Sequence, residues 1–191
     1  VSAEDYLRAA FAALKAGGDA VYCAASLQTI RRMRDEGIPV CGHLGLIPSI
    51  EFLRSPRGPS AYRIVPDLAV GSRGPVASVA IYTTRDMKDV RSIALDTSSR
   101  TSVTLIRVLC HHHFGIQPQF VPHGPDLAAM TREHDAGLLI GDPAFDADHA
   151  ALGLEKIDLG AEWTTFTGLP FIYAAWTGRA GVITADDVAA L

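Results

Sequence analysis

Apolar residues recur along this chain with two different periods, and the alternation between these periods predicts an α/β fold. Helical spacing marks the series Tyr6, Leu7, Ala10, Phe11 and Leu14 after a capping-box pattern at Ser2 and Asp5, and a second helix is expected from Ser26 to Gly37. Short apolar runs typical of strands occupy residues 19–24, 38–46, 76–83, 92–95, 119–121, 137–141 and 171–176. Strands that alternate with helices favour parallel pairing through right-handed crossovers.

A hydroxyl-rich turn separates the predicted strand at 92–95 from a helical apolar series that includes Val103, Ile106 and Leu109. The first N–H groups of a helix have no partner within it and lie at the positive end of its dipole, so hydroxyls gathered there favour an anion site. We therefore expect a carboxylate or phosphate to bind at Thr97, Ser98, Ser99 and Thr101. The alternative is that one hydroxyl of this turn only caps the helix.

Two further turns fall at the ends of predicted elements, at Gly74-Pro75 and at Gly141-Asp142-Pro143. Ligands of open α/β sheets bind beyond the carboxyl ends of the strands. Gly141 and Asp142 are therefore expected to face the same cleft as the hydroxyl-rich turn.

Composition narrows the class of partner. Hydrophobic residues make up 48% of the 191 residues, charged residues make up 20%, and the net charge is −4 without any long basic run. This composition favours a globular protein with a small ligand over one that binds nucleic acid or an anionic membrane. No apolar stretch reaches the roughly 20 residues of a membrane span, and the three well-separated cysteines favour reduced thiols, so a cytoplasmic location is predicted.

No metal ion or cofactor is predicted from the sequence. Neighbouring residues of a helix point about 100° apart, so the three residues His111–His113 cannot converge on one ion, and a helix end exposed to solvent is the simpler interpretation. The acidic stretch at Asp142, Asp146, Asp148 and His149 matches no ligand spacing. Phosphate-loop, dinucleotide and Ser-His-Asp patterns are absent. The aromatic residues Trp163, Phe166 and Trp176 are expected either to line a pocket or to lie in the core.

Residues 45–184 resemble chorismate dehydratase of the futalosine route to menaquinone. The resemblance rests on the motifs Gly45–Leu53, Tyr62–Asp67, Gly74–Val79, Leu95–Ser102, Leu139–Ala144, Asp158–Trp163 and Thr167–Trp176. It implies a two-lobed, periplasmic-binding-protein-like (type II) fold and, without a cofactor, loss of water from chorismate to give 3-[(1-carboxyvinyl)oxy]benzoate. It also implies that Ser78 is a catalytic hydroxyl and that the helix start at Ser98 and Ser99 holds a substrate carboxylate. The alternative for Ser78 is a small residue tolerated within a strand.

Residues 1–49 resemble ketopantoate hydroxymethyltransferase instead, through the run Met33–Ser49. Such (β/α)₈ barrels need about 250 residues, so His43 of this run is expected to be a structural relic. The two resemblances together predict an engineered chimera. In this chimera a barrel-derived fragment (1–49) completes a partial first lobe, 50–75 form the connection and lobe crossover, 76–145 form the second, ligand-binding lobe, and 146–191 return to the first.

The expected function is that of a dehydratase-like scaffold that binds small, chorismate-like carboxylates with little or no turnover. The family's Tyr-Leu-Asn type loop has no counterpart before residue 45, and a site that lacks one wall positions its substrate poorly and admits water. The alternatives are an active chorismate dehydratase completed by a homo-oligomer and, more distantly, a ketopantoate hydroxymethyltransferase-like aldolase.

Overall fold

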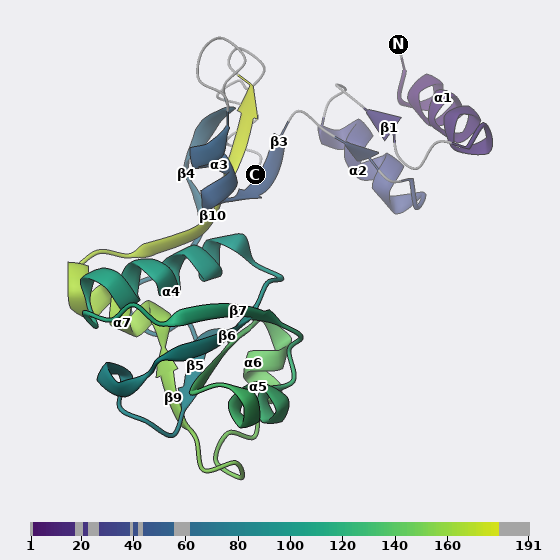
Figure 1. Ribbon diagram of the computed structural model, residues 1–191. Coiled ribbons are helices and arrows are strands. Elements are labelled where there is room, and N and C mark those ends of the chain that lie inside the picture. Colours follow the sequence, from purple (N-terminus) through teal and green to yellow (C-terminus); the bar gives the residue numbers. More distant parts are fainter. Residues whose placement is uncertain are drawn as a thin grey trace. The chain divides into compact units, whose positions relative to one another are not determined.

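The computed structural model describes residues 2–17, 21–22, 27–38, 40–41, 44–55 and 62–179 (Figure 1). The chain divides into two compact units. The small unit comprises the described residues within 1–47, 55–68 and 175–191, and the large unit comprises 48–54 and 69–174. The boundaries predicted at 49, 75 and 145 stay predictions, and Cys23 and His43 lie outside the described residues.

The first helices of the small unit follow the predicted pattern. Helix α1 (Ala3–Lys15) begins with the capping box of Ser2 and Asp5, in which each side chain bonds the other residue's backbone N–H. These hydrogen bonds lower the pKa of Asp5. Along the chain, helix α2 (Leu27–Asp35) falls between two short strands, β1 (Val21–Tyr22) and β2 (Val40–Cys41), which pair with each other in parallel. The local core is built from Leu7, Ala10, Met33 and Ile38.

The strand expected at 38–46 is wrong as a single element. Its first half is β2, which pairs with β1, whereas its second half belongs to β3 (Leu44–Pro48) in another sheet. That sheet has three strands in the order β3-β10-β4, with β4 at Tyr62–Ser72 and β10 at Phe171–Arg179. Helix α3 (Ser49–Arg54) follows β3 directly.

A five-stranded mixed sheet forms the centre of the large unit, in the order β7-β6-β8-β5-β9. Its strands are β5 (Val79–Thr83), β6 (Ser92–Asp96), β7 (Gln119–His123), β8 (Ala136–Ile140) and β9 (Glu155–Asp158). Strand β6 is parallel to β7 and β8, whereas β5 is antiparallel to β8 and β9. The predicted fold class of α/β with mixed sheets and helical crossovers is confirmed, whereas the periplasmic-binding-protein-like type stays a prediction.

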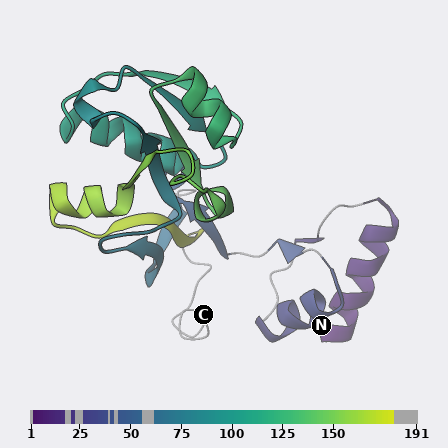
Figure 2. The same cartoon turned by 90° about the horizontal axis from the view of Figure 1, so that it is seen from below.

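Helices cover both faces of this sheet because successive strand side chains point to opposite sides (Figures 1 and 2). Ile93 and Leu95 of β6 pack with α4 (Arg100–His112) and α7 (Leu159–Thr167). Ala94, between them, packs on the other face with α5 (Leu127–Glu133) and α6 (Asp142–Asp146). A short 3₁₀ turn, η1 (Met87–Asp89), joins β5 to β6.

One boundary and one element differ from the sequence prediction. Strand β5 begins at Val79 rather than at residue 76, because residues 76–78 form a turn with Ala77 at a φ of 61°. Strand β9 was not predicted, since its sequence Glu-Lys-Ile-Asp contains only one apolar residue.

Cys110 fits the prediction of reduced, buried cysteine. Its thiol forms no disulfide, and the residue is 1% exposed on the face of α4 that packs into the core. Burial raises the pKa of its thiol to about 12, so the thiolate is disfavoured at neutral pH.

Asp135 joins the starts of β6 and β8. Its carboxylate accepts the N–H groups of Arg91 (2.9 Å) and Ser92 (3.0 Å) and pairs with Arg85 at 3.1 Å. The Arg91 N–H is the largest of the effects that hold the pKa of Asp135 below its ordinary 3.8. A lowered folded-state pKa contributes stability that is present above about pH 4 and is lost as the pH falls through the folded value.

Replacing Asp135 by asparagine is expected to lower the free energy of unfolding at pH 7 by about 1–2 kcal/mol, because the N–H groups lose a charged acceptor. The difference should shrink as the pH falls below 3.8. Urea unfolding at pH 7 and near pH 3 measures both values. Asp86→Asn is the matched control, since this carboxylate is exposed and its contacts, to the Lys88 N–H and ammonium, lie within its own turn. A deficit for Asp135→Asn that persists unchanged at low pH would contradict the assignment.

Candidate functional site

The predicted site residues gather at one edge of the five-stranded sheet. This edge contains the carboxyl ends of β6 and β8 and the amino end of β5, because β5 runs antiparallel to β8. Ser98 follows β6, Gly141 follows β8, and Ser78 precedes β5. The backbone N–H of Gly141 donates to the carbonyl oxygen of Ser78 at 2.7 Å, so these two residues are direct neighbours.

The hydroxyls of the turn before α4 have different uses. Ser99 caps the helix, since its oxygen accepts the Ser102 N–H at 3.3 Å. Thr101 is 4% exposed, and its oxygen accepts the Ile50 N–H at 3.4 Å. Thr97 and Ser98 are exposed, and their hydroxyls make no recorded hydrogen bond within the described part of the chain. The capping alternative therefore accounts for Ser99, whereas Thr97 and Ser98 remain available to a ligand.

A cavity of about 370 Å³, here called the cationic cavity, opens beside this turn within the large unit. It is lined by Ile50, Arg54, Thr97, Arg100, Val103, Thr104 and Arg107. Arg100 pairs with the Glu51 carboxylate at 3.0 Å, and the Arg107 guanidinium lies 4.6 Å from the centre of the Phe120 ring. Glu51 thus offsets one of three arginine charges, and the cavity keeps a positive balance that suits an anion.

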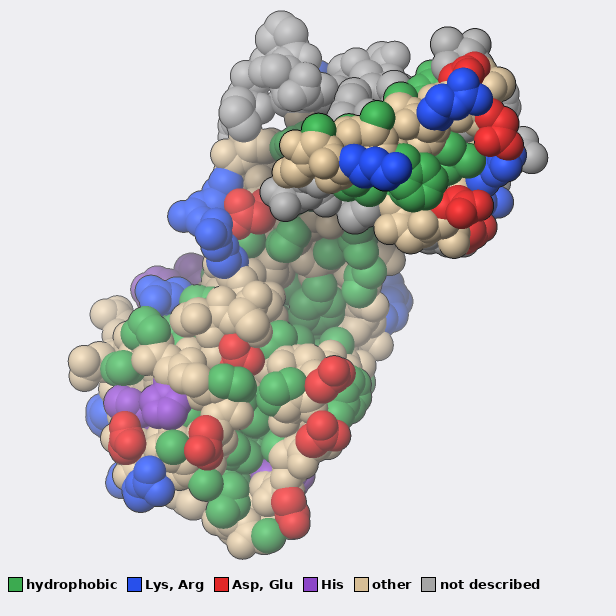
Figure 3. Space-filling model, turned by 90° about the vertical axis from the view of Figure 1, so that its right-hand side faces the viewer, with side chains coloured by type: hydrophobic (Ala, Val, Ile, Leu, Met, Phe, Trp, Pro, Cys, Tyr) green, Lys and Arg blue, Asp and Glu red, His purple; other side chains and the backbone are tan. Residues whose placement is uncertain are grey.

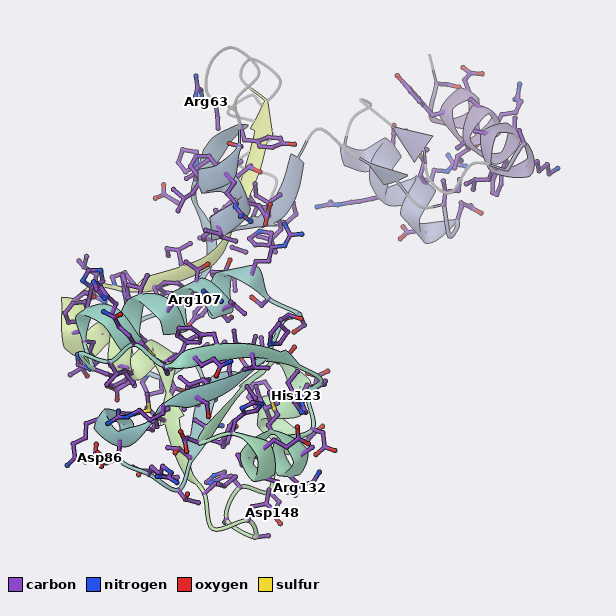
Figure 4. The ribbon with its side chains drawn as sticks, in the orientation of Figure 1. Arg63, Asp86, Arg107, His123, Arg132 and Asp148 are labelled. Carbon is purple, nitrogen blue, oxygen red and sulfur yellow. The ribbon has the colours of Figure 1, made fainter. Side chains whose placement is uncertain are left out.

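Figure 4 shows Arg107 on α4 and Arg132 on α5. These helices cover opposite faces of the sheet, so the two arginines are well separated. On the face of the large unit seen in Figure 3, acidic and hydrophobic side chains are interspersed. The concentration of arginine in the cationic cavity therefore contrasts with the net charge of −4 of the chain.

A second, smaller cavity of about 180 Å³ has a mainly apolar lining of Ser49, Ile50, Leu53, Thr101, Thr104, Leu105, Val108, Trp163, Phe171 and Ile172. Trp163 and Phe171 meet edge to face, with ring centres 5.1 Å apart. The Trp163 indole N–H is buried and is the one such side-chain group without a hydrogen-bond partner among the described residues. Of the aromatic residues singled out in the sequence, Trp163 thus lines a pocket, whereas Phe166 is exposed and contacts the His113 ring.

Ser78, Gly141 and Asp142 do not line either of these two cavities. Ser78 lies immediately before β5, not inside a strand, and its N–H donates to the Val76 carbonyl at 2.7 Å. Its hydroxyl makes no recorded hydrogen bond within the described residues. Gly141 has a φ of 70° and precedes α6, and Asp142 is exposed at the start of that helix. The roles predicted for these three residues stay predictions.

The three histidines of the run lie in different surroundings. His111 and His112 end α4 in exposed positions, whereas His113 Nε2 lies 2.8 Å from the Glu162 carboxylate and is partly buried. Among the described residues no group of three or more His, Cys, Asp or Glu side chains is arranged to hold a metal ion. No described helix combines the length and the apolar character that a membrane span needs.

Sequence reasoning missed the arginines of the cationic cavity. Arg100, Thr104 and Arg107 recur at i, i+4 and i+7, a spacing that places them on one face of a helix. This polar stripe was readable from the sequence. The contribution of Arg54 was not, because it depends on the packing of α3 against α4.

Comparison with known proteins places this chain in a family. The family model for menaquinone biosynthesis matches residues 28–191. The match includes part of the 1–49 stretch that resembles ketopantoate hydroxymethyltransferase, and the chimera stays a prediction. The chain is also 29% identical over 151 residues to the chorismate dehydratase of Thermus thermophilus, an alignment that covers 71% of this chain and 54% of that relative. The chain thus spans about half the length of this curated relative.

Solved structures resemble the fold at lower sequence identity. The protein AF1704 from Archaeoglobus fulgidus is 18% identical with a TM-score of 0.51, over 86% of this chain and 58% of that one. The periplasmic aliphatic sulphonate binding protein SsuA from Escherichia coli is 13% identical with a TM-score of 0.46, over 86% and 62%. The predicted resemblance to chorismate dehydratase is confirmed by the family match and the curated relative together. The chain belongs to the menaquinone biosynthesis family.

Proposed function

We propose that this chain binds a chorismate-like carboxylate in the cationic cavity. The observation that carries the proposal is the set of three arginines and the free Thr97 hydroxyl around one cavity of about 370 Å³. Guanidinium groups bind carboxylates through paired, charge-assisted hydrogen bonds, and a threonine hydroxyl supplies a further donor. The resemblance to chorismate dehydratase supports a carboxylate rather than a phosphate as the anion.

The edge of the sheet supports a second contact for the same ligand. Strands β6 and β5 are separated by β8, so their ends lie two strand spacings apart, or roughly 10 Å. A small cyclic dicarboxylate can extend over this distance from Thr97 to Ser78. Ser78 then donates its hydroxyl to the far end of the ligand, in line with the catalytic role that the resemblance implies.

Turnover by this 191-residue chain alone is proposed to be little or none. The proposal follows from the absence of the family's Tyr-Leu-Asn type loop before residue 45. Positioned groups and exclusion of water contribute much of the rate of such a reaction. A homo-oligomer that completes the site is the competing function, in which case activity per chain rises with protein concentration.

Calorimetric titration with chorismate tests binding, and chromatography of the same mixture for 3-[(1-carboxyvinyl)oxy]benzoate tests turnover. Binding of one ligand per chain, weakened by added salt because arginine charges are screened, is the expected result. Shikimate, a monocarboxylate with a similar ring, is the comparison ligand and is expected to bind more weakly. Absence of heat and of product at every concentration would exclude the proposed function.

A further inference from the structure

The turn that presents Ser78 is tied to α7 and to its N-cap by hydrogen bonds from backbone N–H groups of the turn to side chains. This Gly74–Ser78 turn contains Ala77, whose φ of 61° is unfavourable for a residue with a Cβ atom. The Gly74 N–H donates to Thr164 Oγ1 of α7 at 2.8 Å, and the Lys156 ammonium donates to the Ala77 carbonyl at 2.9 Å. The turn therefore keeps an unfavourable conformation because neighbouring groups hold it.

Asp158 makes the most contacts to this turn. One carboxylate oxygen accepts the Ala77 N–H at 2.6 Å, and both oxygens lie within 3.1 Å of the Val76 nitrogen. The same side chain caps α7, accepting the N–H groups of Gly160 at 2.9 Å and Ala161 at 3.0 Å through Oδ1. Capping alone needs one side-chain oxygen. The second oxygen is thus left for the turn.

We propose that Asp158 is a positioning residue, whose carboxylate holds the Gly74–Ser78 turn against the start of α7 and thereby aims the Ser78 hydroxyl at a ligand on the carboxyl edge of the sheet. This inference rests on the proposed function for its ligand. The attachment of the turn to Asp158 does not depend on the proposed function, because it follows from hydrogen bonds within the large unit.

Asp158→Asn separates the two roles of the side chain, which are to cap α7 and to bind the Gly74–Ser78 turn. An asparagine oxygen still caps α7, but the amide nitrogen that replaces the other oxygen is a donor and cannot accept the Ala77 N–H. Amide hydrogen exchange at Ala77, whose N–H bonds only the replaced oxygen among the described residues, is expected to accelerate at least tenfold, with exchange at Gly160 and Ala161 changed much less. Asp126→Asn is the matched control, since Asp126 caps α5 through the Ala129 N–H and its carboxylate bonds no second segment among the described residues.

The ligand arm uses chorismate titrated into the same variants and into Ser78→Ala. Asp158→Asn and Ser78→Ala are each expected to weaken binding about tenfold, the effect of one hydrogen bond, whereas Asp126→Asn binds like the wild type. Asp158→Ser, which also caps but cannot reach the turn, gives the same comparison if the asparagine variant does not fold.

The two arms fail in distinguishable ways. Unchanged exchange at Ala77 in a folded variant overturns the positioning role, whatever chorismate does. Wild-type affinity in Asp158→Asn together with weakened binding in Ser78→Ala overturns it as well. A wild-type chain that does not bind chorismate overturns the proposed function, and the exchange arm then decides whether Asp158 holds the turn.

Discussion

Replacing Gly160 by alanine is expected to destabilise the chain by about 3 kcal/mol, although alanine is ordinarily the better helix residue by about 1 kcal/mol. A Cβ atom at this position would lie 2.7 Å from the Gly74 carbonyl oxygen, 2.8 Å from Ser72 Oγ and 3.1 Å from the Tyr173 hydroxyl. The first of these atoms is backbone, in the turn that Asp158 and Thr164 hold in place. The turn or α7 must therefore move.

Chemical denaturation of Gly160→Ala and Gly124→Ala measures this effect against a matched control. An added Cβ at Gly124 meets nothing within 4 Å, and this residue has no positive φ. Gly124→Ala is expected to stay within about 1 kcal/mol of the wild type or to be slightly stabilised, because alanine restricts the unfolded chain. Equal stability of Gly160→Ala and the wild type would show that α7 does not pack closely on the Gly74–Ser78 turn.

Replacing Arg100 and Arg107 together by glutamine is expected to weaken chorismate binding by about tenfold to a hundredfold or more. Each charge-assisted hydrogen bond contributes about 1.5–3 kcal/mol, and about 1.4 kcal/mol is a factor of ten in affinity. Glutamine has nearly the helix propensity of arginine, so α4 is expected to form. Loss of the exposed Arg100–Glu51 pair has little effect on stability.

Arg132→Gln is the control for the arginine pair. Arg132 is exposed on α5, on the opposite face of the sheet, and lies 3.8 Å from the Glu133 carboxylate. The affinity of Arg132→Gln for chorismate, measured by calorimetry at constant salt, should remain within twofold of the wild-type value. A similar loss in both variants would show that a general effect of net charge, rather than the cationic cavity, determines binding.

Local signals predicted the elements that local hydrogen bonds build. The capping box at Ser2 and Asp5 identified α1, and the change from a short apolar run to helical spacing identified β6, the turn and α4. The placement of Ser98 and Gly141 on one sheet edge also followed from the expectation that ligands meet the ends of strands. Ser78 was singled out by the family resemblance alone, and its position on the same edge was not predicted.

Long-range contacts account for what the sequence did not predict. Residues 76–78 have a strand-like pattern but form a turn. The N–H groups of Val76 and Ala77, which a strand would donate to its neighbouring strand, donate to the Asp158 carboxylate instead. The antiparallel direction of β5 within a mostly parallel sheet likewise depends on β8 and β9. The cationic cavity combines an α4 stripe with Arg54 of α3, which no local period connects.

The most direct test of the carboxylate site is a crystal structure of the chain grown with chorismate. A carboxylate group of the ligand is expected within hydrogen-bond distance of the Arg100 guanidinium and the Thr97 hydroxyl, with the ring extended toward Ser78. Chorismate seated elsewhere on the large unit, with the cationic cavity filled only by water, would contradict this expectation.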